Sequence, residues 1–516
     1  MRAIWMLAPL ILGCRADKEP ADPTDTDAPT TSDSVTTDTD TDTRVETSLP
    51  TADSATPPAV YREVSCLDGM GVEAPGMVCA YVSMPQNRVR ETGRDIDLFL
   101  VRPADPPVTS ALPLVVLAGG PGAPHCPFAG DKGLPITLSE LLGREVIYVE
   151  QRGLAPGLPD TACDLDGASD EAAVFAACRA ELESDLVDVH SFHTLENAAD
   201  IGELAGALGV PQIDVFAGSY ATRLVGKALT HHGDGIRAAV MGGVDVPGAT
   251  DLSLPARFEG VLTAAGDDFA ARCVADPACD AYLPGFDLAA ELDRIDVLAA
   301  RDGSVSIAGI PFGNASQVRD AFHQMMYLAQ VRNLFFAATY HAARESSPLF
   351  HQHIGEGDEA AGEVYVVELF EAAAQAVYGG SSVMSTVTRC YDGQAAACAV
   401  MGDRIDDYPP EQFTSPTGAD HPVLMLSGTF DPATPAANVD GFLPLFTSGQ
   451  ESEFSCLGHD VSRVSNLANG TCLAEQVVSF LDDPTAPLPD CAAAMCDGVP
   501  LAPTRTDIDA LLDAYL

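Results

Sequence analysis

Apolar and polar positions alternate along the chain beyond residue 58 in a pattern typical of an α/β protein. Short apolar runs, several ending near glycine, are separated by longer segments with helical periodicity such as Leu195–Leu208. The runs are Ile96–Val101, Leu112–Leu117, Val146–Val149, Ile213–Phe216 and Ala238–Met241. Continuous apolar runs of this length are typical of buried strands in a parallel sheet. The alternation therefore predicts an α/β fold with a mostly parallel central sheet.

The pattern of apolar and polar positions changes between about residues 251 and 415, where long helical patterns dominate. The expected helices are Pro255–Cys273, Ala289–Arg301, Gln317–Leu328, Asn333–Arg344 and Val364–Tyr378, and Val305–Ile310 is the expected strand. Buried-strand patterns return at Pro422–Leu426 and Glu451–Cys456, with a helix near Pro435–Phe446 between them. Because the sheet resumes after the insertion, we expect a helical cap at 251–415. The core then consists of residues 59–250 and 416–488, followed by a tail at 489–516.

The first residues resemble a bacterial export signal. Met1-Arg2 precedes an apolar run from Ile4 to Leu12, which is too short to span a bilayer. The stretch Leu10–Cys14 resembles a lipobox, which implies a signal peptide at 1–13, cleavage before Cys14 and lipidation of its thiol. A plain secretory signal with an incidental cysteine is the alternative. We expect a lipid-anchored protein on the cell surface or the periplasmic face of a bacterial membrane.

Residues 14–58 are mostly Asp, Thr, Pro and Ser, including DTDTDT at 38–43. Such a composition cannot form a core and repels itself, so we expect an extended, disordered stalk. The whole chain has 75 acidic and 27 basic residues, a formal net charge of −48. A surface this acidic excludes nucleic acid as a partner.

Fourteen cysteines in an exported chain predict disulfide bonds. Pairing neighbours in sequence leaves Cys126 over as a free thiol once Cys14 is set aside. The proposed pairs are Cys66/Cys79, Cys163/Cys178, Cys273/Cys279, Cys390/Cys398, Cys456/Cys472 and Cys491/Cys496. The chain has no C-x-x-C pair or histidine-rich spacing, so we predict no metal site and no cofactor. We also reject a thiol enzyme at Cys126, because His125 is its direct neighbour in sequence and such side chains rarely meet.

The stretch IDVFAGSYATRLV at 213–225 places a serine among small residues where a strand gives way to a helix. A nucleophile on a sharp strand-to-helix turn needs small flanking residues. Ala217 and Ala221 occupy the positions that G-x-S-x-G gives to glycine, and alanine also meets the need. The motif is weak alone, because a serine that merely caps a helix has the same appearance.

Two further residues follow the carboxyl ends of predicted strands. Asp431 comes after Pro422–Leu426, and His459 comes after Glu451–Cys456. Each alone could be a helix cap or an ordinary surface residue. Together the order Ser219, Asp431, His459 is that of an α/β-hydrolase triad. Ser219 would be the nucleophile, His459 its base and Asp431 the group that orients the imidazole.

The negative charge on the tetrahedral intermediate of such a reaction needs two backbone N–H donors. The first is expected from Tyr220, the residue after the nucleophile. The second is expected from Gly120 in the turn Gly119–Gly122, which follows the strand Leu112–Leu117.

The set of motifs resembles the α/β-hydrolases of the proline iminopeptidase and tripeptidyl aminopeptidase group, most closely the secreted tripeptidyl-aminopeptidase-like branch. The resemblance runs from about Cys66 to Leu488. It is carried by AGGPG, VEQRG, PDTACD, LENAADIGELAGALGV, AGSYAT, MGGVDVP, C-x-x-D-P-x-C, TRCYDG, SGTFDPATP and GHD. The sequence departs from the family pattern at Ala118, Glu150, Ala221 and Asp460, and none of these positions belongs to the triad.

The resemblance implies an exported serine aminopeptidase that releases short peptides or single residues from free N-termini. Cap carboxylates would bind the substrate's ammonium group, with Glu259, Asp320 and Glu368 as candidates. The same triad could act as a carboxylesterase on small esters, because a fold does not fix the substrate. A catalytically inactive surface-binding protein is the third hypothesis, motivated by the altered serine motif.

Overall fold

The computed structural model describes residues 61–90, 93–163, 171–246, 255–354, 382–391, 397–398, 408, 412–413, 418–469, 472–497, 499–504 and 506–507. The expected signal peptide, the lipidation site Cys14 and the expected stalk lie outside the described residues. The expected helix Val364–Tyr378, with Glu368, also lies outside them.

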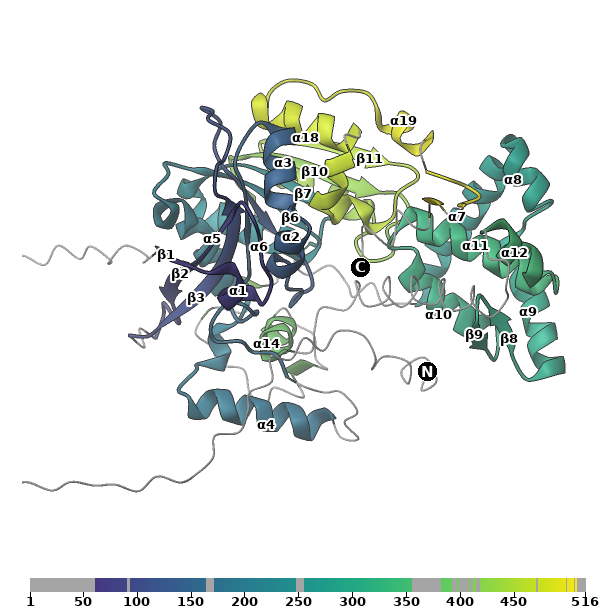
Figure 1. The fold of residues 1–516 in the computed structure, drawn as a ribbon, viewed down its shortest axis with the longest axis horizontal. Helices are drawn as coiled ribbons and strands as arrows, with labels where there is room; N and C mark the ends of the chain where they lie inside the picture. Colours follow the sequence, from purple (N-terminus) through teal and green to yellow (C-terminus); the bar gives the residue numbers. More distant parts are fainter. Residues whose placement is uncertain are drawn as a thin grey trace, which may run out of the picture.

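A nine-stranded sheet forms the centre of the structure, in the order β1-β2-β3-β5-β4-β6-β7-β10-β11 (Figure 1). The first three strands in this order run antiparallel to their neighbours, and all pairs from β5 to β11 are parallel. The strands are β1 (Tyr61–Val64), β2 (Met77–Pro85), β3 (Asp95–Pro103), β4 (Leu114–Leu117), β5 (Val146–Val149), β6 (Ile213–Gly218), β7 (Ile236–Gly242), β10 (Pro422–Gly428) and β11 (Ser448–Phe454). This confirms the predicted, mostly parallel sheet.

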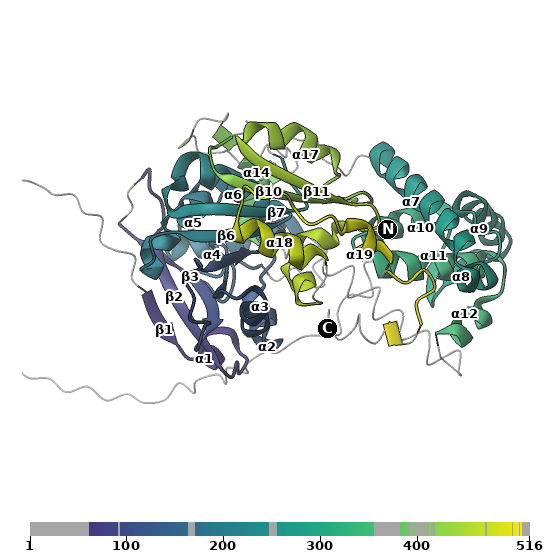
Figure 2. The ribbon, with the colours of Figure 1, turned by 90° about the horizontal axis from the view of Figure 1, so that it is seen from above.

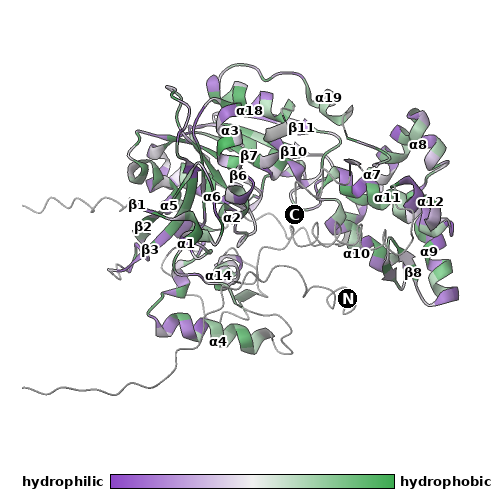
Figure 3. Cartoon of the chain, in the orientation of Figure 1, coloured by the Kyte–Doolittle hydropathy of each residue, from purple (hydrophilic) through white to green (hydrophobic). Residues whose placement is uncertain are grey.

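Helices cover both faces of the sheet because its strands are apolar on both sides. Along β4, Val115 and Leu117 pack beneath α5 (Thr194–Leu208) and α6 (Tyr220–His232). Leu114 and Val116 face the opposite core, with α3 (Leu134–Leu142) and α18 (Cys472–Asp482). The hydropathy colouring shows this apolar interior (Figure 3). Two buried faces explain why the strands read as continuous apolar runs.

A second group of helices lies to one side of the sheet, beyond the ends of β10 and β11 (Figure 2). It consists of α7 (Pro255–Ala275), α8 (Pro277–Tyr282), α9 (Leu288–Asp302), α10 (Ala315–Met325), α11 (Ala329–Ala343) and α12 (Ser347–His353). The group has its own apolar core, built around Phe322, Phe335 and Phe336. The expected single strand Val305–Ile310 is instead a hairpin of β8 (Val305–Ile307) and β9 (Ile310–Phe312). The chain reverses there because Ala308 and Gly309 both have positive φ, 47° and 86°.

Six disulfide bonds join described cysteines, and Cys126 is free and buried. Four of the predicted pairs are confirmed, and the last two are wrong. Cys456 pairs with Cys496 and Cys472 pairs with Cys491, across 40 and 19 residues. The reason is that α19 (Ala492–Asp497) packs against β11. This packing brings Cys496 close to Cys456 at the end of that strand, so Cys496 does not pair with Cys491.

Disulfides in this number indicate a protein that folds in an oxidising compartment outside the cytosol. Within the described ranges, none of the helices has both the length and the apolar character needed to cross a membrane.

Candidate active site

Ser219 occupies a strained turn between β6 and α6. Its φ is 56° and its ψ is −128°, a conformation that residues with a side chain rarely adopt. The backbone N–H of Ser219 donates to the carbonyl of Gly242, 2.8 Å away, at the end of the neighbouring strand β7. The strain and the sharp reversal are those of a strand-to-helix turn that exposes a nucleophile at the edge of a parallel sheet.

His459 and Asp431 are hydrogen-bonded to each other. Nδ1 of His459 lies 2.7 Å from Oδ2 of Asp431. The aspartate is fully buried and the histidine is 6% exposed. Asp431 follows the end of β10, and His459 begins a short 3-10 helix, His459–Ser462, after β11. The two strands are parallel neighbours, so both residues emerge at the same edge of the sheet.

The Asp431 carboxylate is held in a fixed orientation. Its Oδ1 accepts the backbone N–H groups of Ala433 and Thr434, both at 2.8 Å. Its Oδ2 accepts the Thr434 hydroxyl at 2.7 Å in addition to facing the imidazole. Thr434, which the sequence analysis did not identify, thus helps to place the carboxylate. The signal for it was the SGTFDPATP segment, where a threonine follows the aspartate by three residues.

The segment that carries His459 lies directly against the Ser219 turn. A Cβ atom added to Gly218 would collide with the carbonyl oxygen of Ser462, and one added to Gly242 would collide with that of Val461. The structure therefore brings the three predicted catalytic residues to the same edge of the sheet. Within the described residues, no hydrogen bond joins Ser219 Oγ to the His459 ring, a contact that enzymes without bound substrate often leave open.

The turn Gly119–Gly122 faces the serine from the end of β4. Gly120 has a φ of 114°, which requires glycine, and a Cβ atom on it would meet the N atom of Gly122 at 2.5 Å. Tyr220 is the first residue of α6, where a backbone N–H is not used by the helix's own ladder. The two predicted oxyanion donors therefore belong to segments that flank Ser219 on either side.

The end of β5 supports this turn through two neighbouring side chains. Nε2 of Gln151 donates to the carbonyl of Ala118 at 2.5 Å. Oε1 of Glu150 accepts the backbone N–H groups of His125 and Cys126 at 2.7 and 2.6 Å. Burial raises the pKa of Glu150 to about 8 and also raises the pKa of the Cys126 thiol. Both ends of the turn segment are thus fastened to the same strand end.

Gly119 allows a direct test of how closely the turn approaches the serine. A Cβ atom on Gly119 would lie 2.5 Å from the Cβ and 3.0 Å from the Oγ of Ser219. We expect Gly119→Ala to lower kcat/KM by about 100-fold or more, because either the turn or the serine must move. Gly206→Ala is the matched control, since its added methyl group meets nothing within 4 Å on a helix. Equal kcat/KM values for the two variants would contradict the geometry.

Aromatic side chains of the helical group pack next to His459. The ring of Tyr327 lies 4.9 Å from the imidazole of His459, centroid to centroid. The His323 ring lies 6.1 Å from Tyr327 and 5.0 Å from Phe258. Burial lowers the pKa of His323, and Asp431 partly opposes that effect. In the sequence Tyr327 follows the apolar residues Met325 and Met326, and nothing there indicates its contact with His459, which is far away along the chain.

Asp460, next to His459, links the helical group to the sheet. Its Oδ2 accepts the N–H of Ala329, the first residue of α11, at 3.0 Å and that of Gly458 at 3.1 Å. Burial raises the pKa of this carboxyl. Nη2 of Arg332 on α11 donates to the carbonyl of Cys456 at 2.9 Å, on the same side. Asp460 is one of the positions where the sequence departs from the family pattern, and here it anchors α11 beside the histidine.

We expect Asp460→Ala to destabilise the protein by about 2–4 kcal/mol, because two buried N–H groups lose their acceptor. Asp460→Asn should retain most of the stability, since one amide oxygen can accept both N–H groups as Oδ2 does. Urea unfolding measures the free energy, and kcat/KM measures the effect on the His459 segment. If the alanine variant were as stable as the asparagine variant, the anchoring role would be wrong.

Two of the three carboxylates predicted to bind a substrate amine lie among the described residues, and both are exposed. Glu259 on α7 is paired with Arg319 at 3.4 Å, and its side chain is 60% exposed. Asp320 on α10 is exposed, and its charge partly opposes the lowering of the His323 pKa by burial. Glu368 lies outside the described residues.

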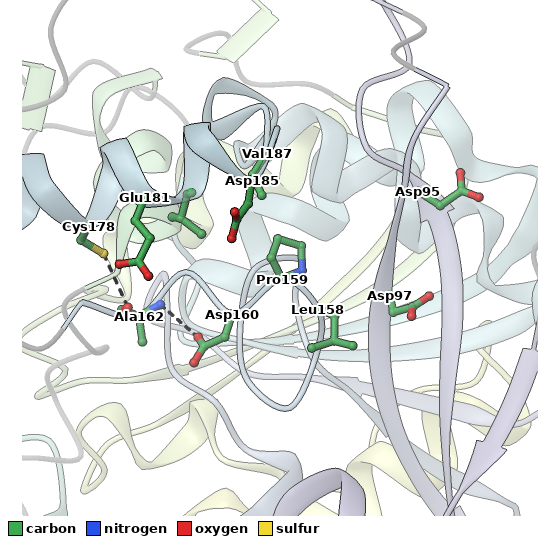
Figure 4. A pocket seen from close by; sticks show the side chains of 11 residues that line it. Asp95, Asp97, Leu158, Pro159, Asp160, Ala162, Cys178, Glu181, Asp185 and Val187 are labelled. Atoms are coloured by element: carbon green, nitrogen blue, oxygen red, sulfur yellow. Dashed lines mark hydrogen bonds between the residues drawn. The ribbon is translucent and has the colours of Figure 1, made fainter. Parts of the chain in front are cut away.

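A separate cavity of about 680 Å³ lies beside β3 and α4 (Glu171–Ser184) (Figure 4). Five carboxylates line it, those of Asp95, Asp97, Asp160, Glu181 and Asp185. None of Ser219, Asp431 and His459 is among its lining residues. Asp97 is already engaged by Arg62 at 3.1 Å and by Ser83 at 2.6 Å.

Comparisons with known proteins agree with this architecture. A family model described as TAP-like protein matches residues 385–493, the segment that includes Asp431 and His459. The strand-turn-helix at Ser219, the glycine turn after β4 and the chain order Ser, Asp, His complete the pattern. The chain has the α/β-hydrolase fold. No curated protein matches its sequence significantly.

Solved structures similar to this α/β-hydrolase include three enzymes of different description. A bromoperoxidase from Bacillus anthracis is 12% identical, with 78% of this chain and 100% of that chain covered and a TM-score of 0.36. A proline iminopeptidase from Mycobacterium smegmatis is 16% identical, with 78% and 98% covered and a TM-score of 0.36. An esterase from Exiguobacterium antarcticum is 14% identical, with 75% and 97% covered and a TM-score of 0.34.

Proposed function

We propose that this α/β-hydrolase is an exported serine aminopeptidase that removes short peptides or single residues from free N-termini. The observation that carries the proposal is the 2.7 Å contact between His459 Nδ1 and Asp431 Oδ2, placed beside the strained Ser219 turn. An imidazole oriented by a buried carboxylate is the device that turns a weak serine hydroxyl into a nucleophile.

The proposed reaction has two steps. Oγ of Ser219 attacks the substrate carbonyl carbon while Nε2 of His459 takes the hydroxyl proton, and the N–H groups of Tyr220 and Gly120 bind the oxyanion. The tetrahedral intermediate then collapses, and the leaving amine takes the proton from the imidazolium. Water repeats the sequence on the acyl-enzyme: His459 accepts its proton and returns it to Ser219 as the acid product departs.

Asp431 serves this cycle without changing its own protonation. Its Oδ2 holds the proton-bearing Nδ1, so Nε2 is left without a proton and ready to act as the base. The N–H groups of Ala433 and Thr434 hold the other carboxylate oxygen and prevent the group from rotating away. The charge of Asp431 stabilises the imidazolium that forms during the reaction.

The preference for peptides over esters rests on the TAP-like family match and the acidic composition of the chain. A free N-terminus carries an ammonium group, which a carboxylate recognises by a charge-assisted hydrogen bond. Asp320 is exposed on α10, the helix whose His323 ring lies 6.1 Å from Tyr327, the residue whose ring contacts His459. It is therefore the described cap carboxylate that we assign first to the substrate amine.

A panel of chromogenic peptides with free or acetylated N-termini tests the assignment. We expect turnover of the free peptides and a loss of about 100-fold or more on acetylation, because the ammonium contact disappears and a carboxylate is left unpaired. Equal turnover of both forms would overturn the aminopeptidase assignment. Cleavage of simple acyl esters without peptide activity would instead identify the carboxylesterase.

A fluorophosphonate probe separates an enzyme from an inactive relative. We expect the native chain to become labelled at Ser219, because the probe reacts with activated serines. Absence of labelling in the folded protein would favour the non-catalytic surface-binding protein.

A further inference from the structure

A buried cluster of three chemically different side chains lies where α2 (Cys126–Asp131) begins beside the end of β5. The imidazole of His125, the thiol of Cys126 and the carboxylate of Glu150 each offer a ligand atom, and these atoms all lie within 4.8 Å of one another. Cys126 is fully buried, Glu150 is 1% exposed and the His125 side chain is 13% exposed. The proposed catalytic reaction uses none of the three.

Two facing atoms of the cluster lack hydrogen-bond partners. Oε1 of Glu150 is fully used, because it accepts the backbone N–H groups of His125 and Cys126. Its Oε2 is buried without a hydrogen bond, and so is Nδ1 of His125, which faces it at 3.6 Å. A buried polar atom without a partner costs about 1–3 kcal/mol, and native proteins rarely tolerate it without an ion, a water molecule or a function.

We propose that His125, Cys126 and Glu150 bind a zinc-class divalent metal ion. Imidazole, thiolate and carboxylate are the ligands that Zn²⁺ takes in proteins. Two zinc bonds of about 2.1 Å at a tetrahedral angle place their ligand atoms about 3.4 Å apart, which is close to the observed separation of Nδ1 and Oε2.

The charge balance favours the ion in this buried place. A thiolate and a carboxylate together carry two negative charges, which the divalent ion cancels, while the histidine stays neutral. Binding breaks the S–H bond of Cys126, forms the metal–sulfur bond and releases one proton to the solvent. The neutral site avoids the cost of an uncompensated buried charge.

The position of the site gives the ion a structural role. His125 and Cys126 end the segment that begins with the Gly119–Gly122 turn, and Glu150 precedes Gln151, which holds the start of that segment. A metal ion would therefore fix the turn that faces Ser219 to the end of β5. Sequence spacing did not reveal this site, because two of its ligands are adjacent and the third is 24 residues away.

The test uses the full-length, disulfide-bonded chain carrying Cys14→Ser, so that Cys126 is the single remaining free thiol among the 14 cysteines. After treatment with a chelator and dialysis, the protein is titrated with Zn²⁺ and with Co²⁺. We expect one equivalent of metal per chain, and a thiolate-to-cobalt charge-transfer band in the near ultraviolet. Tight binding should also raise the melting temperature.

Single substitutions identify the ligands. We expect Cys126→Ser to abolish the cobalt band. We expect His125→Gln to weaken zinc binding by more than about 100-fold, because loss of a residue that only supports a ligand weakens metal binding by about 10- to 100-fold. His421→Gln is the matched control: this half-buried histidine lies elsewhere, 3.1 Å from the carbonyl of Gly233, and its loss should leave binding unchanged. Circular dichroism verifies that each variant is folded.

Three results would overturn the proposal. They are no metal uptake by the chelator-treated parent chain, metal uptake without a charge-transfer band, and uptake that Cys126→Ser leaves unchanged. If a substituted chain fails to fold, the cobalt titration of the parent chain alone tests the proposal, because the charge-transfer band requires a thiolate ligand. None of these results bears on Ser219, so a failed metal site and a failed hydrolase assignment stay distinguishable.

Discussion

Replacing Ser219 with alanine should abolish hydrolysis, with kcat falling by about 10⁴- to 10⁶-fold, the range seen when a triad nucleophile is removed. The acyl-enzyme cannot form without Oγ, and any residual rate would come from the oxyanion donors and substrate binding alone. Hydrolysis of the preferred chromogenic peptide measures kcat, and loss of fluorophosphonate labelling reports the same atom independently.

The control for this experiment is Ser306→Ala, an exposed serine on the hairpin strand β8. That variant should keep full turnover and full labelling. Persistence of labelling in Ser219→Ala would show that another serine is the nucleophile, and the proposed mechanism would fail.

Asp431→Asn should lower kcat by about 10⁴-fold with little change in KM. The amide oxygen can take over the bonds from the N–H groups of Ala433 and Thr434. The amide nitrogen then occupies the place of Oδ2 and donates toward Nδ1 of His459, which drives the proton to Nε2. An imidazole in that tautomer cannot accept the serine proton. Steady-state kinetics on the same peptide separates kcat from KM.

Asp293→Asn is the matched control, because Asp293 is exposed on α9, in the helical group with its separate core. It removes one negative charge without touching the imidazole and should leave both constants unchanged. A fully active Asp431→Asn enzyme would show that the carboxylate does not orient His459.

The sheet could be predicted from the sequence because its strands are buried on both faces. The apolar pattern predicts Val146–Val149 with the bounds that the structure gives, and the predicted strand Ile213–Phe216 falls short of β6 by two residues, Ala217 and Gly218. Small residues at that strand end look like a turn in sequence, yet they complete the strand and create the close approach to Ser462. The same small residues made the serine recognisable.

Contacts between distant segments could not be predicted, since no local pattern encodes them. The role of Asp460 depends on its hydrogen bond with Ala329 on α11, and the role of Tyr327 depends on its contact with the ring of His459. Both partners are far away along the chain. The adjacent positions of His125 and Cys126 in the sequence predict side chains that do not meet. The structure places their ligand atoms together because both flank the first turn of α2, opposite Glu150.

The bond between Cys456 and Cys496 ties the segment that bears His459 to a distant part of the chain. Cys456 lies three residues before His459, and its partner is 40 residues further along. Reduction of this bond would release the histidine segment from α19 while leaving every proposed reactive group in place. The proposed hydrolysis should therefore depend on the redox state of the surroundings as well as on the reactive groups themselves.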